Sequence, residues 1–523
     1  SQQVSGSAVQ IGNPIQEKKV LDAQLQARDK GLYRAVTDYG AGGISCAVGE
    51  MGEKCGATIH LDRVPLKYAG LAPREIAISE SQERMGYGVP KESVEAFLDT
   101  FRREDVDATI IGEFTSTGRF RIEYQGNVVA DLDMDFLFDG IPQLVRKAHW
   151  EPAVFPEPEF PEPGDMTSSL HNILQAWNVC SKEHFVRQYD HEVRGGSVLK
   201  PFVGAENDGP GDAAIIRPRL GSNRGVIISC GLNPKYGAID PYWMAASAID
   251  EALRQVVAVG GSLERVAILD NFCWGNTSKP DRLASLVRAS LACYDIAKVY
   301  ETPFISGKDS LNNEFTYGGE TIAIPGTLLI SALSVMEDVT RAVSMDAKEA
   351  GNQIYIVGET YDELGGSHYY ELNGFVGNKV PKVTPAKGKA LMEALSRATA
   401  VGLVRSCHDL SEGGLGVAAA EMAFAGGIGM RLWLDQVPLG EPISRSDSIL
   451  FSESNTRFLV EVAPALCETF ETALDGFPAA RIGELIGDPG FEIYGAGQRE
   501  GQIIVSASIF DLKASWQAPF KDW

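Results

Sequence analysis

Alternating stretches of apolar and polar residues along the chain predict short strands that are followed by helices. Residues 31–38 (GLYRAVTD) have the pattern of a short strand that ends in a carboxylate. A glycine-rich turn follows, and the segment after it is rich in Ala, Val and Met, which predicts a helix. Residues 406–424 (SCHDLSEGGLGVAAAEMAF) repeat the same order of strand, carboxylate, glycine turn and helix.

The middle of the chain predicts a sheet that is covered by helices. Strands are expected at 213–218 (AAIIRP), 224–230 (RGVIISC), 265–274 (RVAILDNFCW) and 302–307 (TPFISG). One helix is expected from residue 242 to a stop at Gly260-Gly261, and another from Pro280 to about Val299. These elements predict an α+β fold with the helices packed on one side of a sheet.

An internal repeat spans most of the chain. Residues 37–51 (TDYGAGGISCAVGEM) match 408–422 (HDLSEGGLGVAAAEM), so that Asp38 aligns with Asp409 at an offset of 371. LDRVPL at 61–66 matches LDQVPL at 434–439, and SESQ at 79–82 matches SESN at 452–455, both at an offset of 373. Two copies of one domain therefore flank a different domain.

A proline-rich segment at 151–165 (EPAVFPEPEFPEPGD) predicts an extended linker, because proline is excluded from helix interiors and central strands. We therefore divide the chain into a first repeat at 1–150, the linker at 151–165, a middle domain at 166–345 and a second repeat at 346–523.

The charge balance limits the possible partners. The chain carries 47 Lys and Arg against 70 Asp and Glu, a net charge of −23, which disfavours binding to nucleic acid. No apolar run of about 18 residues is present, so we expect no membrane span. The eight cysteines are scattered, without zinc-binding spacing, which is typical of a reduced, cytoplasmic protein. Ser at position 1, with no secretory leader after it, indicates a processed, trimmed or partly ordered chain.

Four carboxylates are candidates for a cleft, since each is expected at a strand end or in a turn: Asp38, Glu80, Asp270 and Asp309. Such oxygen ligands suit Mg²⁺ that is shared with substrate phosphates. The alternative for a single Asp ahead of a glycine turn is a helix cap or turn residue.

Two kinds of turn could hold phosphate. The glycine turns at 38–43 and 409–414 place backbone N–H groups at a helix N-terminus, although purely structural turns use the same glycines. The segment 303–315 (PFISGKDSLNNEF) predicts one turn that brings together Gly307, Lys308, Asp309 and Ser310 after a strand. It is not a Walker A loop, and a surface turn is the alternative.

No nucleophile or zinc-protease motif is present, and for His408 and His191 we expect either a role in supporting site residues or a structural role.

Eight motifs in order resemble one family. They are DYGAGGISCAVGEM, LDRVPL, SESQERM, GDAAIIRP, NPKYGAIDPY, ILDNFCWGN, PFISGKDSL and HDLSEGGL. Together they make the whole chain similar to phosphoribosylformylglycinamidine synthase, within the wider aminoimidazole ribonucleotide synthetase-like superfamily. The resemblance implies A-type and B-type domains in the order A1, B1, A2, B2, with the B-type domain present twice in this chain.

The family resemblance also implies a reaction. ATP phosphorylates the amide oxygen of formylglycinamide ribonucleotide, and ammonia from glutamine then displaces phosphate from the iminophosphate to give the amidine. ATP and Mg²⁺ are the implied cofactors. Oriented amides and magnesium would stabilise the charge that grows on the transferring phosphoryl group.

By motif match the resemblance assigns roles to individual residues. The implied substrate contacts are Gln10, Glu80, Ser81, Gln82 and Ser310. The implied ATP-binding residues are Asn233, Asp270, Gly307 and Lys308. The implied metal ligands are Asp38 and Asp309. The second repeat resembles the place where some family members keep a structural nucleotide, with Asp409 and Glu453 facing it; a decayed, empty cleft is the alternative.

Two departures from the family pattern matter. Lys308 stands where many members have a magnesium-binding Asn, in SGKDSL rather than GGNVSL, so that either Asp309 or Lys308 has to compensate. The A1 domain with the family's catalytic histidine, the first half of B1 and a glutaminase domain have no match in this sequence. We therefore expect no catalytic histidine here, and a partner chain or domain that carries A1, with ammonia from a glutaminase subunit or free ammonium.

Two other hypotheses remain open. The chain could be a non-catalytic nucleotide-binding scaffold, which would bind ATP or ADP tightly and tolerate loss of Asp38 or Glu80. It could also be another ATP-dependent superfamily member that acts on a different carbonyl or amide.

Overall fold

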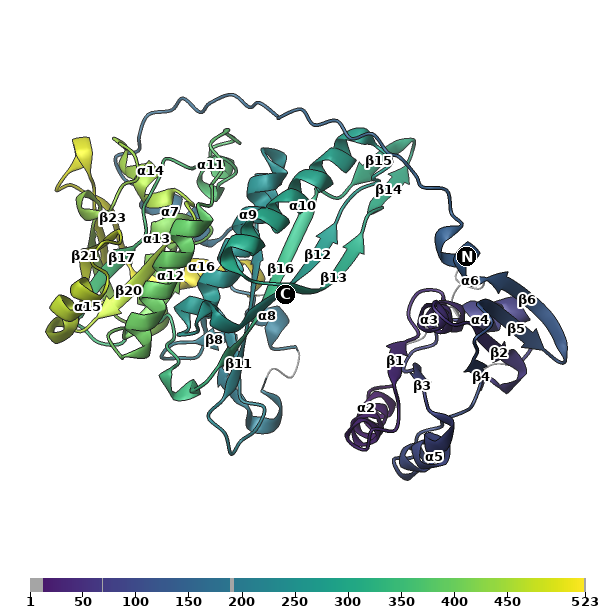
Figure 1. Ribbon diagram of the computed structural model, residues 1–523. Coiled ribbons are helices and arrows are strands. Elements are labelled where there is room, and N and C mark those ends of the chain that lie inside the picture. The colour runs from purple at the N-terminus through teal and green to yellow at the C-terminus, as the bar shows by residue number, and fades with distance from the viewer. Residues whose placement is uncertain (1–12, 68, 189–191, 522–523) are drawn as a thin grey trace. The chain divides into compact units, whose positions relative to one another are not determined.

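The computed structural model describes residues 13–67, 69–188 and 192–521, and the chain divides into two compact units (Figure 1). The N-terminal unit comprises Ser1–Val145, and the C-terminal unit comprises Arg146–Trp523.

The N-terminal unit contains two small sheets. β1 pairs antiparallel with β3, and a four-stranded sheet has the order β4-β2-β5-β6. The elements are α2 (Pro14–Asp29), β1 (Ala35–Asp38), α3 (Gly43–Gly52), β2 (Ala57–His60), α4 (Pro73–Ile78), β3 (Met85–Gly88), α5 (Val94–Arg103), β4 (Gly112–Phe114), β5 (Arg119–Tyr124), β6 (Asn127–Asp133) and α6 (Met134–Asp139). One apolar cluster lies beneath α3 and α4, and a second lies between α2 and α5.

The proline-rich segment has no helix or strand, as predicted, but it is attached to the C-terminal unit. The Phe155 N–H donates to Asn378 Oδ1 at 2.8 Å, and the Phe160 ring stacks on Phe375 with 5.7 Å between ring centres. The segment is therefore a strap on that unit, and the division between the units falls ahead of it, between Val145 and Arg146.

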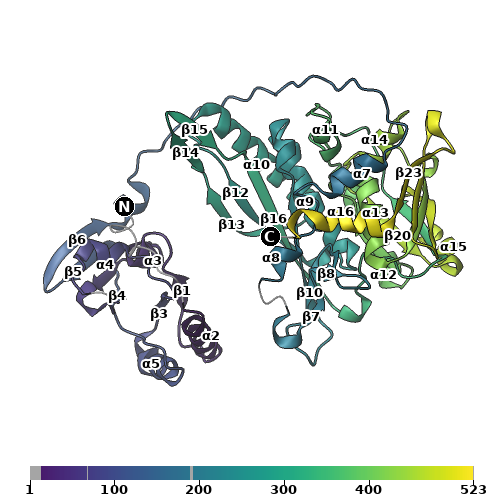
Figure 2. The ribbon, with the colours of Figure 1, turned by 180° about the vertical axis from the view of Figure 1, so that it is seen from behind.

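The first sheet of the C-terminal unit has six strands in the order β13-β12-β16-β11-β10-β7 (Figure 2). Their bounds are β7 (Ser197–Leu199), β10 (Ala214–Ile216), β11 (Gly225–Leu232), β12 (Val266–Cys273), β13 (Phe304–Ser310) and β16 (Thr327–Met336). The helices α9 (Pro241–Ala258) and α10 (Pro280–Tyr300) pack on one face through a shared apolar core. The strands and helices predicted for this region are confirmed.

Local sequence explains where the long helix α9 begins and ends. Asp240 caps it by accepting a hydrogen bond from the Tyr242 N–H at 2.9 Å, and Pro241 occupies the first turn, where no amide partner is needed. Gly260, with φ of 92°, follows the last turn.

The second sheet of the C-terminal unit has seven strands in the order β18-β20-β17-β21-β19-β22-β23. The elements from here to the C-terminus include β17 (Gln353–Val357), α12 (Pro385–Ala400), β18 (Ser406–Asp409), α13 (Gly414–Gly426), β19 (Gly429–Trp433), α14 (Ser446–Phe451), β20 (Phe458–Val462), α15 (Cys467–Ala473), β21 (Ala479–Ile486), β22 (Gly490–Tyr494), β23 (Ile503–Ser508) and α16 (Ile509–Gln517). The strand β17 lies between β20 and β21 and is antiparallel to both.

The sequence repeat is also a repeat of structure. β1 pairs with β3 as β18 pairs with β20, so that Asp38 faces Met85 and Asp409 faces Phe458. The order β4-β2-β5-β6 is repeated by β21-β19-β22-β23, with the same parallel pair inside it. The fold is α+β, with the B-type domain present twice around an A-type domain.

The turn predicted at GKDS is wrong. Gly307, Lys308, Asp309 and Ser310 lie inside β13, which pairs parallel with β12, and Asp270 lies inside β12 rather than at its end. Backbone pairing with the neighbouring strand β12 continues β13 through these polar residues, a long-range effect that local pattern does not contain.

A search of the described residues finds no helix with the length and apolar character of a membrane span.

Candidate functional site

The glycine turn of the N-terminal unit has a backbone that only glycine adopts easily. Gly42 and Gly43 have φ of 79° and 56°. A Cβ on Gly43 would lie 2.2 Å from the Ser79 carbonyl oxygen, so the turn packs directly on the segment that leads to Glu80. The Gly42 N–H donates to Glu80 Oε1 at 3.4 Å. Glu80 therefore orients the turn.

The second glycine turn has the same construction. Gly413 and Gly414 have φ of 77° and 62°, and a Cβ on Gly414 would lie 2.2 Å from the Ser452 carbonyl oxygen. The Gly413 N–H donates to Glu453 Oε1 at 2.8 Å. The matched motifs thus encode one device, a glycine turn held against a Ser-Glu-Ser segment.

An arginine fixes the Ser-Glu-Ser segment in both copies. The Arg457 guanidinium donates to the Ser452 carbonyl at 2.6 Å and to the Ser454 carbonyl at 2.9 Å. Arg84 donates to the carbonyls of Ser79 and Ser81 in the same way. The arginine was not among the predicted site residues, although its alignment in SESQER and SESNTR was available as a signal.

The remaining candidates of the N-terminal unit are at its surface. Asp38 is exposed, and its Oδ1 accepts the Gly40 N–H at 3.1 Å. Ser81 is half-buried with its hydroxyl 3.1 Å from that of Ser79, and Gln82 is exposed. Gln10 lies outside the described residues.

In the A-type domain, Asp270 and Gly307 share the face of the sheet that is covered by helices. They are paired across β12 and β13, and a Cβ on Gly307 would lie 2.4 Å from Asp270 Oδ1, so glycine makes room for the carboxylate. Partial burial, followed by the charge of Asp309, raises the pKa of Asp270. Asp309 shares this face by strand alternation.

Lys308 and Ser310 point to the opposite face by the same alternation. The Lys308 ammonium donates to the Ser310 hydroxyl and to the Asp309 carbonyl at 3.3 Å. The residues predicted to share one turn are thus divided between two faces of a strand.

Glu453 lies at the centre of a buried polar cluster in the C-terminal unit. Besides the Gly413 N–H, it accepts hydrogen bonds from the Tyr236 hydroxyl at 2.6 Å and from the His368 N–H at 3.1 Å, and its side chain contacts His368 Nδ1 at 3.2 Å. Burial alone would raise the pKa of Glu453, but these donors outweigh it, and the pKa lies below its ordinary value.

Further carboxylates surround Glu453 and Asp409. Glu251, on α9, accepts from the Leu232 N–H at 3.0 Å and from Asn233 Nδ2 at 2.6 Å. Burial, followed by the nearby charge of Glu412, raises the pKa of Glu251 well above its ordinary value. Asn233 therefore belongs to this acidic cluster, at the end of β11.

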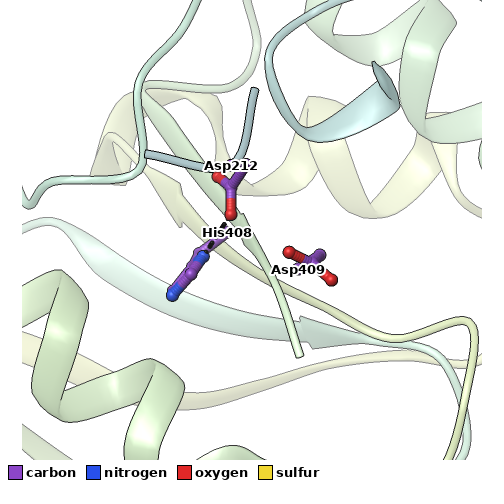
Figure 3. A group of neighbouring side chains, drawn as sticks. All are labelled: Asp212, His408 and Asp409. Carbon is purple, nitrogen blue, oxygen red and sulfur yellow. Dashed lines mark hydrogen bonds and ion pairs between the residues drawn. The ribbon is translucent and has the colours of Figure 1, made fainter. Parts of the chain in front are cut away.

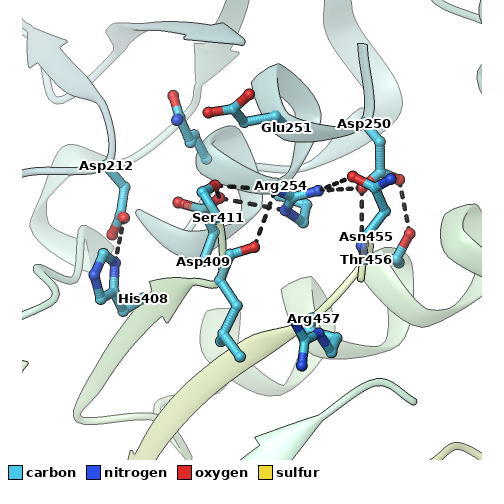
Figure 4. A network of polar contacts seen from close by, with 12 residues as sticks. Asp212, Asp250, Glu251, Arg254, His408, Asp409, Ser411, Asn455, Thr456 and Arg457 are labelled. Atoms are coloured by element: carbon cyan, nitrogen blue, oxygen red, sulfur yellow. Dashed lines mark hydrogen bonds and ion pairs between the residues drawn. The ribbon is translucent and has the colours of Figure 1, made fainter. Parts of the chain in front are cut away.

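Arg254 connects this cluster to the core (Figure 4). It is 2% exposed and donates to Asp250 at 2.6 Å, to Asp409 at 3.3 Å and to the Leu410 carbonyl at 3.1 Å. Asp250 in turn accepts from the Tyr300 hydroxyl at 2.6 Å and the Thr456 N–H at 2.9 Å. Asp250, Glu251 and Arg254 were missed as site residues; charged residues within the alanine-rich α9 were the available signal.

Asp212, His408 and Asp409 form a candidate cation site beside it (Figure 3). One potential ligand atom from each lies within 4.8 Å of the others. Asp212 Oδ1 contacts His408 Nδ1 at 2.6 Å, while Asp212 Oδ2 is buried without a hydrogen-bond partner. Burial raises the pKa of Asp212 to about 6. The unpartnered oxygen and the excess of carboxylates suit a hard divalent cation such as Mg²⁺.

The structure brings together Asn233, Asp409 and Glu453 in one place, and Asp270, Gly307 and Asp309 in another. Asp38 and Glu80 belong to the other unit, so convergence of both units on one nucleotide cleft stays a prediction. The eight cysteines are all free.

Two family models match the chain. "AIR synthase related protein, C-terminal domain" matches residues 1–125 and 349–496, and "AIR synthase related protein, N-terminal domain" matches residues 210–329. The models therefore follow the order of the repeated and central domains.

Curated relatives are similar along almost the whole chain. The phosphoribosylformylglycinamidine synthase subunit PurL of Deinococcus radiodurans is 33% identical over 99% of this chain and 69% of its own length. The subunit of Thermoplasma acidophilum is 32% identical over 98% of this chain and 65% of its own. The chain thus spans about two thirds of the length of these relatives.

Solved structures share the fold. "Structure of PurLQS from Thermotoga maritima" covers 91% of this chain and 68% of its own, with 22% identity and a TM-score of 0.62. "T. maritima PurL complexed with FGAR" covers 91% and 65%, with 22% identity and a TM-score of 0.63. The domain models, the relatives and the shared fold agree with the duplicated architecture and its two glycine turns. The chain belongs to the phosphoribosylformylglycinamidine synthase subunit PurL family.

Proposed function

We propose that the chain is the part of a phosphoribosylformylglycinamidine synthase that carries the B1-type, A2 and B2-type domains. It would act as an ATP-dependent ligase in purine biosynthesis that converts formylglycinamide ribonucleotide to the amidine. The observation that carries this proposal is the 33% identity to a named PurL subunit over 99% of the chain.

The glycine turns are the chemical basis of the proposal. Each places backbone N–H groups at the start of a helix, and such groups hold phosphate oxygens without net positive charge. This construction allows a protein with a net charge of −23 to bind a nucleotide.

The proposed contacts are the ones that the family resemblance implies. Asp38 would hold Mg²⁺, while Gln10, Glu80, Ser81 and Gln82 would bind the ribonucleotide. Asn233, Asp270, Gly307 and Lys308 would bind ATP, with Asp309 as a further metal ligand and Ser310 as a substrate contact. Mg²⁺, when bound, neutralises phosphate charge; the oriented amides of the chain position the transferring group.

The buried acidic cluster supports a second, auxiliary nucleotide site. Asp409, with Asp212 and its unpartnered oxygen, offers carboxylate ligands for Mg²⁺, while Glu453 holds the second glycine turn. The nucleotide itself would bind to that turn.

The A-type sheet supports a partner that carries an A1-type domain. The side of the sheet away from α9 and α10 leaves Ile216, Ile228 and Leu232 each 39% exposed. Apolar side chains gathered on one sheet face are typical of a surface that another domain covers. We place the assembled enzyme in the cytoplasm, with ammonia supplied by a glutaminase subunit.

Reconstitution with a polypeptide that carries the A1-type domain tests the function. With ATP, Mg²⁺, ammonium and formylglycinamide ribonucleotide, we expect the amidine and one ADP per turnover only when both chains are present. Asp38→Asn should lower the rate by at least about a hundredfold, as loss of an electrostatic group at a phosphoryl-transfer site does. Asp131→Asn, at an exposed ion pair with Arg119, is the matched control.

Two results would redirect the assignment. Amidation by this chain alone would contradict the need for a partner. ATP hydrolysis that depends on a different amide would indicate another activity in the same superfamily.

A non-catalytic scaffold is a second candidate, favoured by the richer acidic cluster of the C-terminal unit. It predicts tight ADP binding that is lost with Asp409→Asn and an assembled enzyme that is indifferent to Asp38→Asn.

A further inference from the structure

The strap at residues 151–165 runs between the two domains that would build the auxiliary nucleotide site (Figure 1). Just ahead of it, the Trp150 ring packs on the Arg288 guanidinium of the A-type domain at 5.2 Å. Farther along, the side-chain amide of Asn378, in the second B-type domain, accepts the Phe155 N–H at 2.8 Å and donates to the Phe155 carbonyl at 2.6 Å. The strap is therefore fixed to both domains.

Helix α14 of the second B-type domain takes a hydrogen-bond acceptor from the strap. The Ser446 N–H at its start donates to Glu162 Oε1 at 2.7 Å, and the residue ahead of the helix, Arg445, has no side-chain acceptor to offer. In the first copy, the equivalent helix α4 begins with Pro73, which has no N–H. Glu75 within α4 accepts the N–H of the residue ahead of that helix at 2.8 Å. The strap thus supplies to the second copy what the first copy contains in its own helix.

Phe160 fixes the strap to the same end of α14. Its ring contacts Phe375, with 5.7 Å between ring centres, and the Arg445 guanidinium, at 4.9 Å. Arg445 also donates to the Phe160 carbonyl at 2.8 Å and to Asp447 at 2.5 and 2.9 Å. Asp447 is buried and accepts the Tyr369 hydroxyl at 2.8 Å. A chain of contacts therefore leads from Phe160 to Tyr369.

Two routes lead from Tyr369 to Glu453. Tyr369 lies in α11 (His368–Leu372), beside His368, whose N–H donates to Glu453 Oε1 at 3.1 Å. The Tyr369 ring also stacks on Phe451 at the end of α14, with 4.7 Å between ring centres, and Glu453 follows two residues later. Both helices that position this carboxylate are therefore held by the strap.

We propose that Phe160 and Glu162 are positioning residues of the auxiliary nucleotide site. They hold α11 and α14 so that Glu453 fixes the second glycine turn with its N–H groups directed at a nucleotide phosphate. The proposal rests on the proposed function for the identity of the ligand, and on the contacts above for the coupling between strap and turn.

Coupling of this kind acts in both directions. If a docked strap raises the affinity of the turn for a nucleotide, the bound nucleotide favours the docked strap by the same factor. The first copy, whose helix α4 is capped from within, should show no such dependence. Nucleotide binding to the second repeat is thus tied to the strap.

Amide hydrogen exchange of the full chain tests the coupling without a nucleotide. Phe160→Ala should speed exchange by at least about tenfold at residues 411–416 and 446–455, because a segment opens more often when its contacts are lost. Exchange in the central part of β17 should not change. Phe160→Tyr keeps the ring and should behave as wild type, and Glu159→Ala, at an exposed position of the same strap, is the matched control.

Glu162→Ala removes a single acceptor and gives the same comparison if Phe160→Ala does not fold. Exchange should again become faster at the second turn and stay unchanged in β17. Glu162→Gln keeps a side-chain oxygen that can accept the Ser446 N–H, and it should restore most of the protection.

Calorimetry with ADP and Mg²⁺ tests the ligand. The second turn is identified by the ADP binding that Asp409→Asn removes. Phe160→Ala and Glu162→Ala should each weaken this binding by about fivefold or more, while Glu159→Ala should leave it unchanged. Bound ADP should in turn slow exchange of the Phe155 N–H, which pairs the strap with the second B-type domain.

Three results would overturn the proposal. They are unchanged exchange at the second turn in both Phe160→Ala and Glu162→Ala; equal acceleration in β17, which would mean that the strap only adds general stability; and faster exchange at the turn with unaltered ADP affinity. A wild-type chain that binds no ADP would sink the auxiliary site of the proposed function, and the exchange comparison would still decide whether the strap holds the turn.

Discussion

The two B-type domains share one backbone design but differ in what surrounds it. In both, a positive-φ glycine pair packs against a Ser-Glu-Ser segment that an arginine holds, and even the strained residue ahead of that arginine is repeated, at Glu83 with φ of 58° and Thr456 with φ of 55°. Glu453 is nevertheless buried among four hydrogen-bond contacts, whereas Glu80 is half-buried with one long bond. The turn geometry is thus local, and the electrostatics come from the domain packed against it.

Among substitutions that test the difference between the two domains, we expect the largest loss of stability at Arg254. Arg254→Met would leave Asp250 and Asp409 buried without their cation, and we expect the unfolding free energy of the C-terminal unit to fall by about 3–5 kcal/mol. Denaturant unfolding followed by a probe in each unit measures this. Arg119→Met, at the exposed pair with Asp131, should cost at most about 1 kcal/mol. Equal losses would mean that the buried network adds nothing.

The two glycine turns provide a matched pair of substitutions. Gly43→Ala and Gly414→Ala meet the same 2.2 Å obstruction and the same positive φ, so each should destabilise its own unit by about 3 kcal/mol. Unit-specific unfolding transitions distinguish them. A neutral result at either site would show that this turn rearranges freely.

The two glutamates that accept hydrogen bonds from the glycine turns should contribute differently to stability. Glu453→Gln removes a charged acceptor from several buried donors, and it should lower the unfolding free energy by about 1–3 kcal/mol. Glu80→Gln should lower the unfolding free energy by less than about 0.5 kcal/mol. Comparable losses in thermal unfolding would contradict the difference in surroundings described here.

The smallest effect expected is a pH dependence confined to the C-terminal unit. Burial raises the pKa of Glu363 to about 7 from 4.5, and Glu363 Oε2 has no hydrogen-bond partner. Because the folded pKa is raised, its contribution to stability is fully present below pH 4.5 and is lost as pH rises through about 7. The stability of Glu363→Gln relative to wild type should therefore increase as pH rises from 4.5 to about 7. A constant difference across this range would exclude Glu363 as the source.

Local pattern predicted most strands and helices, because apolar periodicity and terminating glycines are properties of short segments, as at α9 and α10. It failed at Gly307–Ser310, where pairing with β12 extends a strand through four polar residues. The repeat aligned Asp409 with Asp38 and Glu453 with Glu80, and the family resemblance then made Asp409 and Glu453 candidates for an auxiliary site. It missed Glu251 and Arg254, whose partners lie far away in the chain, since contacts such as Arg254 to Asp409 exist only after folding.

The strap that leads into the C-terminal unit limits how far the two units can separate. It is attached from His149 onward, where the His149 N–H donates to the Pro280 carbonyl at 3.1 Å, and α6 of the N-terminal unit ends at Asp139. The tether between these points can reach at most about 36 Å at about 3.3–3.6 Å per residue. A connection this short holds each unit at an effective concentration near the millimolar range around the other.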